Sequence, residues 1–255
     1  MEWSKAKTLL ILLMLAVNLY LGINIYTQLR ARTVEEAGMA RDACVMLQAR
    51  GFELDADAIL DLPADLRAYT FARSMSAEQK AAGELLGDCA QTQMGGGIYV
   101  YDGAVGSVVF RSGGYVELQW TDGTAGDPGL LLAPREKDSR LEMACRDGVY
   151  TLRMDGLPVV GAAVSRSHDD TWTGTWVFSS EPAAGSEALP RARLILAAGD
   201  LLQENGKLRL ESVECVYVLA ALQNGDVRLT PAWKIGSGGE SWLLSALTGQ
   251  LVTPA

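Results

Sequence analysis

The sequence predicts an α+β protein in which an N-terminal transmembrane helix precedes two units, each made of a helix packed on an antiparallel sheet. Three observations support this fold class. An uncharged apolar stretch covers residues 8–26, Asp-Gly and Gly-Gly pairs separate runs rich in apolar residues from residue 98 onward, and helical and strand-like segments occur twice in the same order. With 49% hydrophobic residues in 255, the chain has enough apolar side chains for a buried core.

Residues 8–26 read TLLILLMLAVNLYLGINIY, without a charged side chain. About 20 apolar residues cross the hydrocarbon core of a bilayer, so this segment predicts a transmembrane helix preceded by a cytoplasmic tail of residues 1–7. Trp3, Tyr20 and Tyr26 lie near its ends, where amphipathic rings favour the headgroup region. Two alternatives are a secretory signal peptide, which is usually shorter and followed by a cleavage site, and a buried core helix, which is seldom apolar on every face.

One face of the predicted span carries a polar residue. Met14, Asn18 and Gly22 follow one another at four-residue spacing, so they share a face of the helix. An amide buried in hydrocarbon needs a hydrogen-bond partner, and a glycine on the same face permits close approach of a second helix. These three residues therefore predict an interface for a partner's transmembrane helix, which we name the docking stripe. The other interpretation is that Asn18 bonds to its own backbone.

Charge is unevenly distributed along the chain. Of the 22 basic and 31 acidic residues, only four basic and one acidic lie in the first 32 positions, so the remaining body is strongly acidic. An acidic body is repelled by phosphate backbones, so we predict no nucleic-acid partner, and membrane lipid is the predicted environment of the apolar segment alone. Basic residues flank the span on both sides, so charge does not determine its orientation.

The first unit begins with a helix. It is predicted from Thr33, whose Thr-x-x-Glu pattern with Glu36 is typical of a capping box, to Gly51. We expect the anchor helix to lead directly into it, with a short break or a stagger between the two. Ser76 predicts the N-cap of a second helix that ends at Gly87. The remaining segments predict strands and a loop. The expected strands are 66–72, 98–101, 105–110 and 115–121, and the loop is 121–134.

The second unit repeats this order. Residues 137–146 predict a short helix, and residues 189–203 form the clearest amphipathic helix of the body. Strands are expected at 157–165, 172–179, 207–222, 226–235 and 241–246, with a short run at Leu251. The predicted division of the body is residues 27–134 for the first extracytoplasmic unit and 135–255 for the second.

No motif in the sequence predicts an enzyme. The single histidine, His168, lies in a Ser-His-Asp-Asp run between two predicted strands, so we expect it in a solvated turn. With Asp169 and Asp170 it would need further ligands to hold a metal. The three glycines before residue 98 precede a strand, which is the wrong setting for phosphate binding. Nucleophile elbow, Walker loop, His-Glu-x-x-His and Cys-x-x-Cys motifs are all absent from the sequence. We therefore predict no catalytic residue, no metal and no cofactor.

Four widely spaced cysteines do not match the spacing of a zinc knuckle; they are Cys44, Cys89, Cys145 and Cys215. Outside the membrane they could form disulfides in three possible pairings, of which Cys44 with Cys89 would join the two N-terminal helices. Four buried thiols are the alternative, because free cysteine is among the most buried residue types.

The stretch Pro-Ala-Trp-Lys-Ile at 231–235 predicts a strand. Trp233 and Ile235 point to one face of it. Pro231 cannot donate a hydrogen bond to a neighbouring strand, so we expect it at a strand start or an edge. We interpret the aromatic residues here as core rather than as a ligand platform, because alternating Trp and Ile on strands usually pack. Thr248-Gly249 predicts a turn into the last strand.

Both ends of the chain resemble the YycI regulatory family of Gram-positive bacteria. The start, Met-Glu-Trp-Ser-Lys-Ala-Lys-Thr, is similar to that family's Trp-Ser-Lys-x-Lys opening beside its single transmembrane helix. The C-terminal stretches resemble its Pro-x-Trp-x-Ile strand and Asn-Ala-x-Thr-Gly-Glu ending, although Ser245 and Gln250 depart from that ending and four cysteines are unusual in the family. The matching positions are Trp3, Lys5, Pro231, Trp233, Ile235, Thr248 and Gly249.

The resemblance implies a YycI/YycH-like fold and a single-pass cell-membrane protein with its N-terminus in the cytoplasm and its C-terminal domain outside the cell. Such a protein acts with a YycH-like membrane protein, through transmembrane helix contacts, on a sensor histidine kinase of the WalK type. It thereby regulates the WalK/WalR two-component system of the cell wall without catalysing a reaction. The alternatives are an anchored extracytoplasmic binding module or protease-inhibitor-like protein with no kinase partner, and a carboxylate-dependent cell-wall hydrolase.

Overall fold

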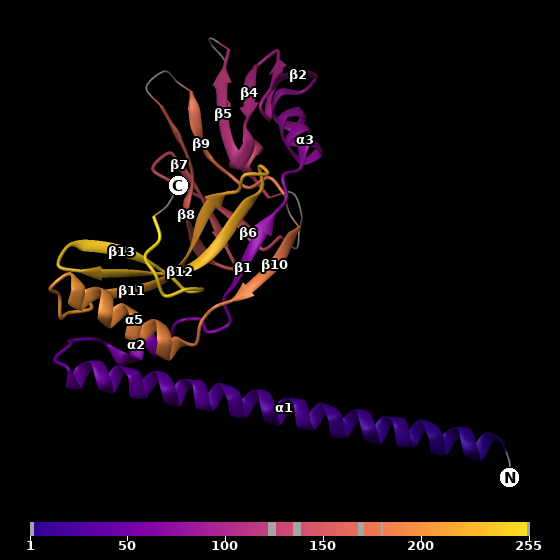
Figure 1. Cartoon of the computed structure of the whole chain (residues 1–255). Coiled ribbons are helices and arrows are strands. Elements are labelled where there is room, and N and C mark those ends of the chain that lie inside the picture. Colours follow the sequence, from indigo (N-terminus) through magenta and orange to yellow (C-terminus); the bar gives the residue numbers. More distant parts are fainter. Residues whose placement is uncertain (1–2, 122–125, 135–138, 168–170, 180, 254–255) are drawn as a thin grey trace.

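The computed structural model describes residues 3–121, 126–134, 139–167, 171–179 and 181–253. The chain forms a mixed α+β body from which a long N-terminal helix projects (Figure 1). The run His168, Asp169 and Asp170 lies outside the described residues, so the expectation of a turn there stays a prediction.

Helix α1 (Trp3–Ala49) is continuous over 47 residues. At a rise of about 1.5 Å per residue it is about 70 Å long, and its N-terminal half lies away from the body (Figure 1). The predicted break after the membrane segment is therefore wrong. Thr33 lies inside the helix, where the preceding turn already supplies acceptors for the backbone N–H groups, so its Thr-x-x-Glu pattern caps no helix start.

Within the described residues, the body contains four shorter helices, one 3₁₀ turn and thirteen strands. The helices are α2 (Ala56–Leu60), α3 (Met75–Leu86), α4 (Gly129–Leu132) and α5 (Arg191–Glu204), and the 3₁₀ turn is η1 (Ser112–Gly114). The strands are β1 (Arg67–Phe71), β2 (Cys89–Gly95), β3 (Ile98–Gly103), β4 (Gly106–Phe110), β5 (Tyr115–Trp120), β6 (Leu141–Arg146), β7 (Val149–Met154), β8 (Leu157–Arg166), β9 (Trp172–Thr175), β10 (Pro182–Glu187), β11 (Ser212–Ala221), β12 (Val227–Ser237) and β13 (Glu240–Ser245).

Several local predictions are corrected by the structure. Helix α3 begins two residues early, because Ser74 rather than Ser76 accepts the N–H of Ala77 at 3.2 Å. The expected helix at 137–146 is wrong over its described part, which is strand β6 paired with β7. Helix α4 lies in the expected loop. Strand β10, with the sequence PAAGSE, has weak β-propensity and forms because β1 offers it an edge.

The strands join into one curled sheet. The main path runs β10-β1-β12-β11-β8-β9-β5-β4-β3-β2, with β13 beside β12, and with β7 and β6 branching from β8. Neighbours are antiparallel except β8 and β11, which are parallel where Val159 meets Tyr217. Strand β1 pairs with β10 and β12, and β5 pairs with β9, so the sheet runs across residue 134. The arrangement as two separate helix-on-sheet units, divided at that residue, is not confirmed.

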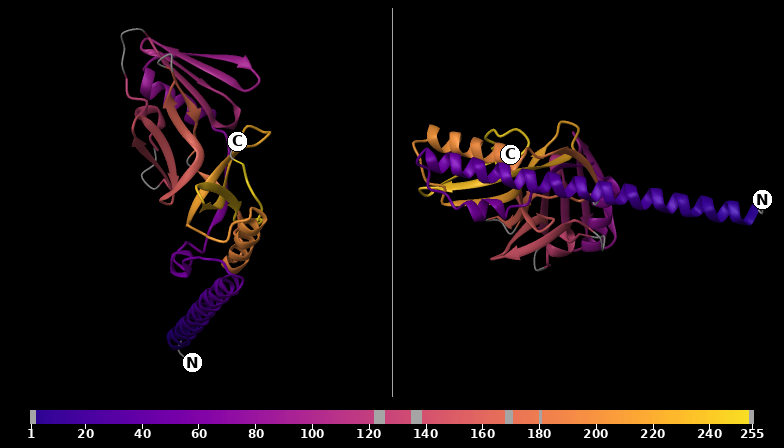
Figure 2. Two further views of the ribbon diagram at one scale, coloured as in Figure 1. Left: turned by 90° about the vertical axis from the view of Figure 1, so that its left-hand side faces the viewer. Right: turned by 90° about the horizontal axis from the view of Figure 1, so that it is seen from below.

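Two large groups of buried side chains hold the body together. One lies beneath α3 and includes Tyr101 and Phe110, whose rings meet edge to face at 5.6 Å. The other lies between α5 and the strands β11–β13, and it includes Trp233. The last turns of α1 join this second core, and α1 runs alongside α5 (Figure 2). The helix that projects from the body is therefore anchored at one end only.

Candidate functional site

The projecting part of α1 is a candidate membrane span. Leu10–Gln28 has a mean hydropathy of 1.9, and none of it is buried within the chain. This segment is about 28 Å long, which matches the hydrocarbon thickness of a bilayer. Apolar side chains on every face of an uncovered helix require apolar surroundings. The prediction of an apolar helix long enough to cross a membrane is confirmed, and the alternative of a buried core helix is excluded.

The docking stripe is exposed along this span. The side chain of Met14 is 60% exposed, Asn18 is exposed, and no atom beyond the helix's own backbone lies within 4 Å of the point that a Cβ on Gly22 would occupy. Asn24, two residues after Gly22, differs because its amide oxygen accepts a hydrogen bond from Gln28 Nε2 at 3.4 Å. The surface of the stripe is thus free to receive a second helix.

One unbroken helix, α1, contains both the docking stripe and the surface that packs against the body, so the two surfaces have a fixed angle between them. At about 100° per residue, Glu36 lies five full turns beyond Asn18 and therefore on the same side of the helix. The residues of α1 that are buried against the body, Ala40, Cys44 and Leu47 among them, lie on that half of the helix too. A rotation or tilt imposed on the stripe therefore turns the surface that holds the body.

The contact between α1 and α5 is built around a glycine. A Cβ added at Gly199 of α5 would lie 2.5 Å from Cδ2 of Leu47, so any side chain at this position would require Leu47 to move. Leu194, Ile195 and Leu202 of α5 are buried in the same core. The interface is close and apolar, and it fixes α1 to α5 rather than leaving it as a hinged tether.

The end of α1 is equally well defined. Gly51 has φ of 91°, and the N–H groups of Gly51 and Phe52 donate to the carbonyls of Gln48 and Leu47 at 2.9 and 3.1 Å. This is a Schellman motif, in which glycine adopts the left-handed conformation and the next residue packs back on the helix. Phe52 is buried beside Leu47 in the second core, as the motif requires. The predicted stop at Gly51 is confirmed.

The positions that carry the family resemblance lie in three places. Trp3 is 85% exposed near the start of α1, and Lys5 lies in the same turn, with a side chain outside the described set. Trp233 and Ile235 are fully buried on β12, in agreement with their interpretation as core. Pro231 lies inside β12, not at its start, at the point where pairing on one side passes from β1 to β13. The turn at Thr248-Gly249 forms, with Gly249 at φ of 71°, and leads into a single bridge at Leu251.

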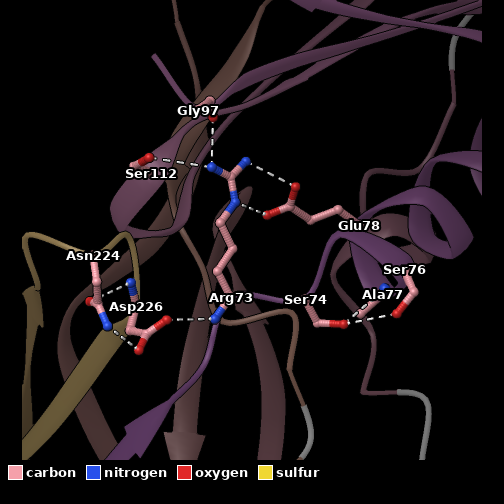
Figure 3. Close-up of polar contacts among 9 residues, drawn as sticks. All are labelled: Arg73, Ser74, Ser76, Ala77, Glu78, Gly97, Ser112, Asn224 and Asp226. Carbon is pink, nitrogen blue, oxygen red and sulfur yellow. Dashed lines mark hydrogen bonds and ion pairs between the residues drawn. The ribbon is translucent and has the colours of Figure 1, made fainter. Parts of the chain in front are cut away.

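A partly buried polar hub joins distant segments of the body (Figure 3). Arg73 donates from Nε and Nη2 to the two carboxylate oxygens of Glu78 at 2.7 and 3.0 Å, and from Nη1 to the carbonyl of Gly97 at 2.6 Å. Ser112 Oγ also accepts from Nη1 at 3.3 Å, and Asp226 accepts the backbone N–H of Arg73 at 2.9 Å. The hub is structural, and no local sequence signal marks it, because the Asp226 partner comes from 153 residues away.

The cysteines are free thiols. Cys44 is buried in the second core, whereas Cys89 packs against the first core, so the possible Cys44–Cys89 disulfide does not form. Burial raises the pKa of the Cys44 thiol, and it raises the pKa of Cys215 to about 11. Across the described ranges, no group of three or more His, Cys, Asp or Glu side chains could hold a metal ion.

Comparison with known proteins adds one distant structural likeness. No family model matches the chain, and no curated protein matches it. Among solved structures, the chain is similar to an uncharacterized protein from Eubacterium rectale, with 12% identity, a TM-score of 0.33, and coverage of 75% of this chain and 86% of that one. A likeness at this level carries no argument about function. The class that the fold itself defines is a mixed α+β protein with an exposed N-terminal apolar helix long enough to cross a membrane.

Proposed function

We propose that this protein is a non-catalytic, membrane-anchored regulator that modulates a WalK-type sensor histidine kinase through transmembrane helix contacts, together with a YycH-like membrane protein. The N-terminus lies in the cytoplasm and the body lies outside the cell. The docking stripe of Met14, Asn18 and Gly22 is the partner interface. The class of partner comes from the resemblance at the two ends of the chain.

The observation that carries this proposal is the continuity of α1 from the exposed apolar span to the second core. A protein that needs only to stay near the membrane can use a flexible linker, since a linker keeps the body close without setting its orientation. Here α1 contains no proline, the residue that most often kinks a helix, and it ends in a close apolar contact with α5. The body and the span are therefore oriented together, which suits a protein that acts through its span.

The test is a replacement of residues 10–28 by an unrelated apolar helix of the same length. The chain and the WalK-type kinase of the same organism are reconstituted in lipid vesicles, and kinase autophosphorylation is measured with and without the chain. We expect the replacement to abolish the change in kinase activity while the body still folds. The matched control carries the same unrelated helix with Met14, Asn18 and Gly22 restored, and we expect it to recover at least part of the effect.

Undiminished modulation of the kinase by the fully replaced span would contradict the proposal. That result would favour the alternative of an anchored binding module, for which any membrane helix serves equally well.

A further inference from the structure

A cleft of about 420 Å³ opens between α1 and the body. Glu35, Glu36 and Met39 form its wall on α1, and the facing wall includes Asp65 and Glu187. Glu35 lies seven residues beyond the end of the candidate span at Gln28, which is about 10 Å along the helix. The cleft therefore lies beside the place where α1 leaves the bilayer, and its volume falls within the range of ~300–1,000 Å³ that is typical of binding sites.

The lining of the cleft is acidic. Four carboxylates and one guanidinium line it, and the guanidinium of Arg67 is paired with Glu187 at 2.5 Å. Glu35, Glu36 and Asp65 are left without a cation among the lining residues, and the side chain of Met39 beside them is 45% exposed. A concave acidic wall with an apolar neighbour attracts a segment that carries Lys or Arg together with apolar residues, and it repels anionic headgroups.

The cleft lies on the side of α1 that carries the docking stripe. Glu36 follows Asn18 by five turns, and Met39 follows Met14 by 25 residues, about seven turns. A partner helix that packs nearly parallel to α1, as most helices of membrane bundles do, therefore leaves the bilayer in the direction of the cleft. The opposite face of α1, which includes Val34, Gly38 and Val45, points away from it.

We propose that the cleft receives the extracytoplasmic juxtamembrane turns of the partner helix that docks on the stripe, and that these turns place Lys or Arg side chains against Glu35, Glu36 and Asp65. This inference rests on the proposed function, because it requires a membrane partner at the stripe. Charge complementarity in the cleft then selects the partner, while apolar packing within the bilayer supplies close contact.

The test uses photo-crosslinking residues in the full-length chain in its native membrane. The first crosslinker replaces Leu21, which lies beside the stripe two turns after Met14. The second replaces Met39, five turns further along the same side, and the control replaces Val45 on the opposite face. We expect the first two variants to capture the same membrane protein. The peptide joined at Met39 is expected to directly follow that protein's apolar span and to carry Lys or Arg, and the Val45 variant is expected not to capture this peptide.

Charge reversal sharpens the test. In the chain with the crosslinker at Met39, the double substitution Glu35→Lys and Glu36→Lys is expected to lower the yield of crosslinked partner protein about tenfold. The control Asp42→Lys, at an exposed position of α1 outside the cleft, is expected to leave that yield unchanged. Changing the captured Lys or Arg residues of the partner to Glu is expected to restore capture by the double-Lys variant.

The outcomes separate the two proposals. Capture at Leu21 without capture at Met39, or capture at Met39 of a segment without basic residues or of a second copy of this chain, overturns this inference and leaves the proposed function standing. An inserted chain that captures no membrane protein at Leu21 overturns the proposed function, and this inference falls with it.

Discussion

Leu47 of α1 lies so close to Gly199 of α5 that a Cβ on the glycine would stand 2.5 Å from Leu47 Cδ2. Both residues are buried, and they join the helix that projects from the body to the helix that covers β11–β13. Through this contact the continuous helix α1, which includes the apolar span, is packed into the second core of the body.

Substituting Gly199→Ala is expected to destabilise the protein. The added methyl group overpacks the contact, which costs about 1–3 kcal/mol, and the gain in helix propensity of about 1 kcal/mol offsets only part of that cost. The measurement is the free energy of unfolding of the full chain in detergent micelles. Gly83→Ala is the matched control, because that helical glycine has open space around it; it is expected to raise stability by about 0.5–1 kcal/mol.

The same contact predicts coupling between its two residues. In the Gly199→Ala background, Leu47→Ala makes room for the new methyl group, so its cost is expected to be smaller than in the unchanged chain by about 0.5 kcal/mol or more. Strict additivity of the two free energies in a double-mutant cycle would show that Leu47 and Gly199 are not in contact.

Substituting Glu78→Gln is expected to cost about 3–5 kcal/mol of stability, because it leaves the Arg73 guanidinium charged in a site where its side chain is only 15% exposed. Urea unfolding followed by tryptophan fluorescence measures the loss. Glu117→Gln serves for comparison: it removes a pair with Arg111 at 3.4 Å whose cation is half exposed, so a change of no more than about 1 kcal/mol is expected. Equal losses of unfolding free energy in Glu78→Gln and Glu117→Gln would contradict the prediction that the Arg73–Glu78 pair stabilises the protein more than the exposed pair does.

Stability is expected to fall between about pH 9 and pH 11. Burial raises the pKa of the Cys215 thiol from 9.0 to about 11, so the unfolded chain loses its proton first. The contribution of this thiol is fully present below pH 9 and is lost as the pH rises toward 11, which amounts to roughly 1 kcal/mol at pH 10. Cys215→Ala is expected to flatten the decline measured from pH 8 to pH 10.

Alanine insertions after Arg30 test whether α1 transmits orientation. Each added residue turns the body by about 100° around the helix axis relative to the stripe. Two alanines therefore place the body and the stripe on nearly opposite sides of the helix, and seven bring them back to within about 20° of their original angle. Kinase modulation in vesicles is expected to be lost with two insertions and recovered in part with seven. A smooth decline with insertion length, without recovery, would mean that α1 acts as a spacer.

Much of the fold was predictable where the signal is local. The strands near 98–121 follow alternating apolar residues and glycine-containing turns, and the helix at 189–203 follows a 3.6-residue period, so both were found within a few residues of their observed bounds. Strands β6 and β10 were not predicted, because they form by pairing with β7 and β1 rather than through a pattern in their own residues. The capping pattern at Thr33 was misleading because a capping box has meaning only where a helix begins.

The sequence alone determined that the chain has an apolar helix long enough to cross a membrane, that Met14, Asn18 and Gly22 share one of its faces, and that Trp233 and Ile235 pack in a core, because hydropathy and side-chain periodicity are properties of consecutive residues. Only the tertiary structure decided that the span and the body share one unbroken helix, that Arg73 reaches Asp226, and that Glu35 and Glu36 face Asp65 across a cleft. These relationships depend on residues that are distant in the chain, and it is packing that brings them together.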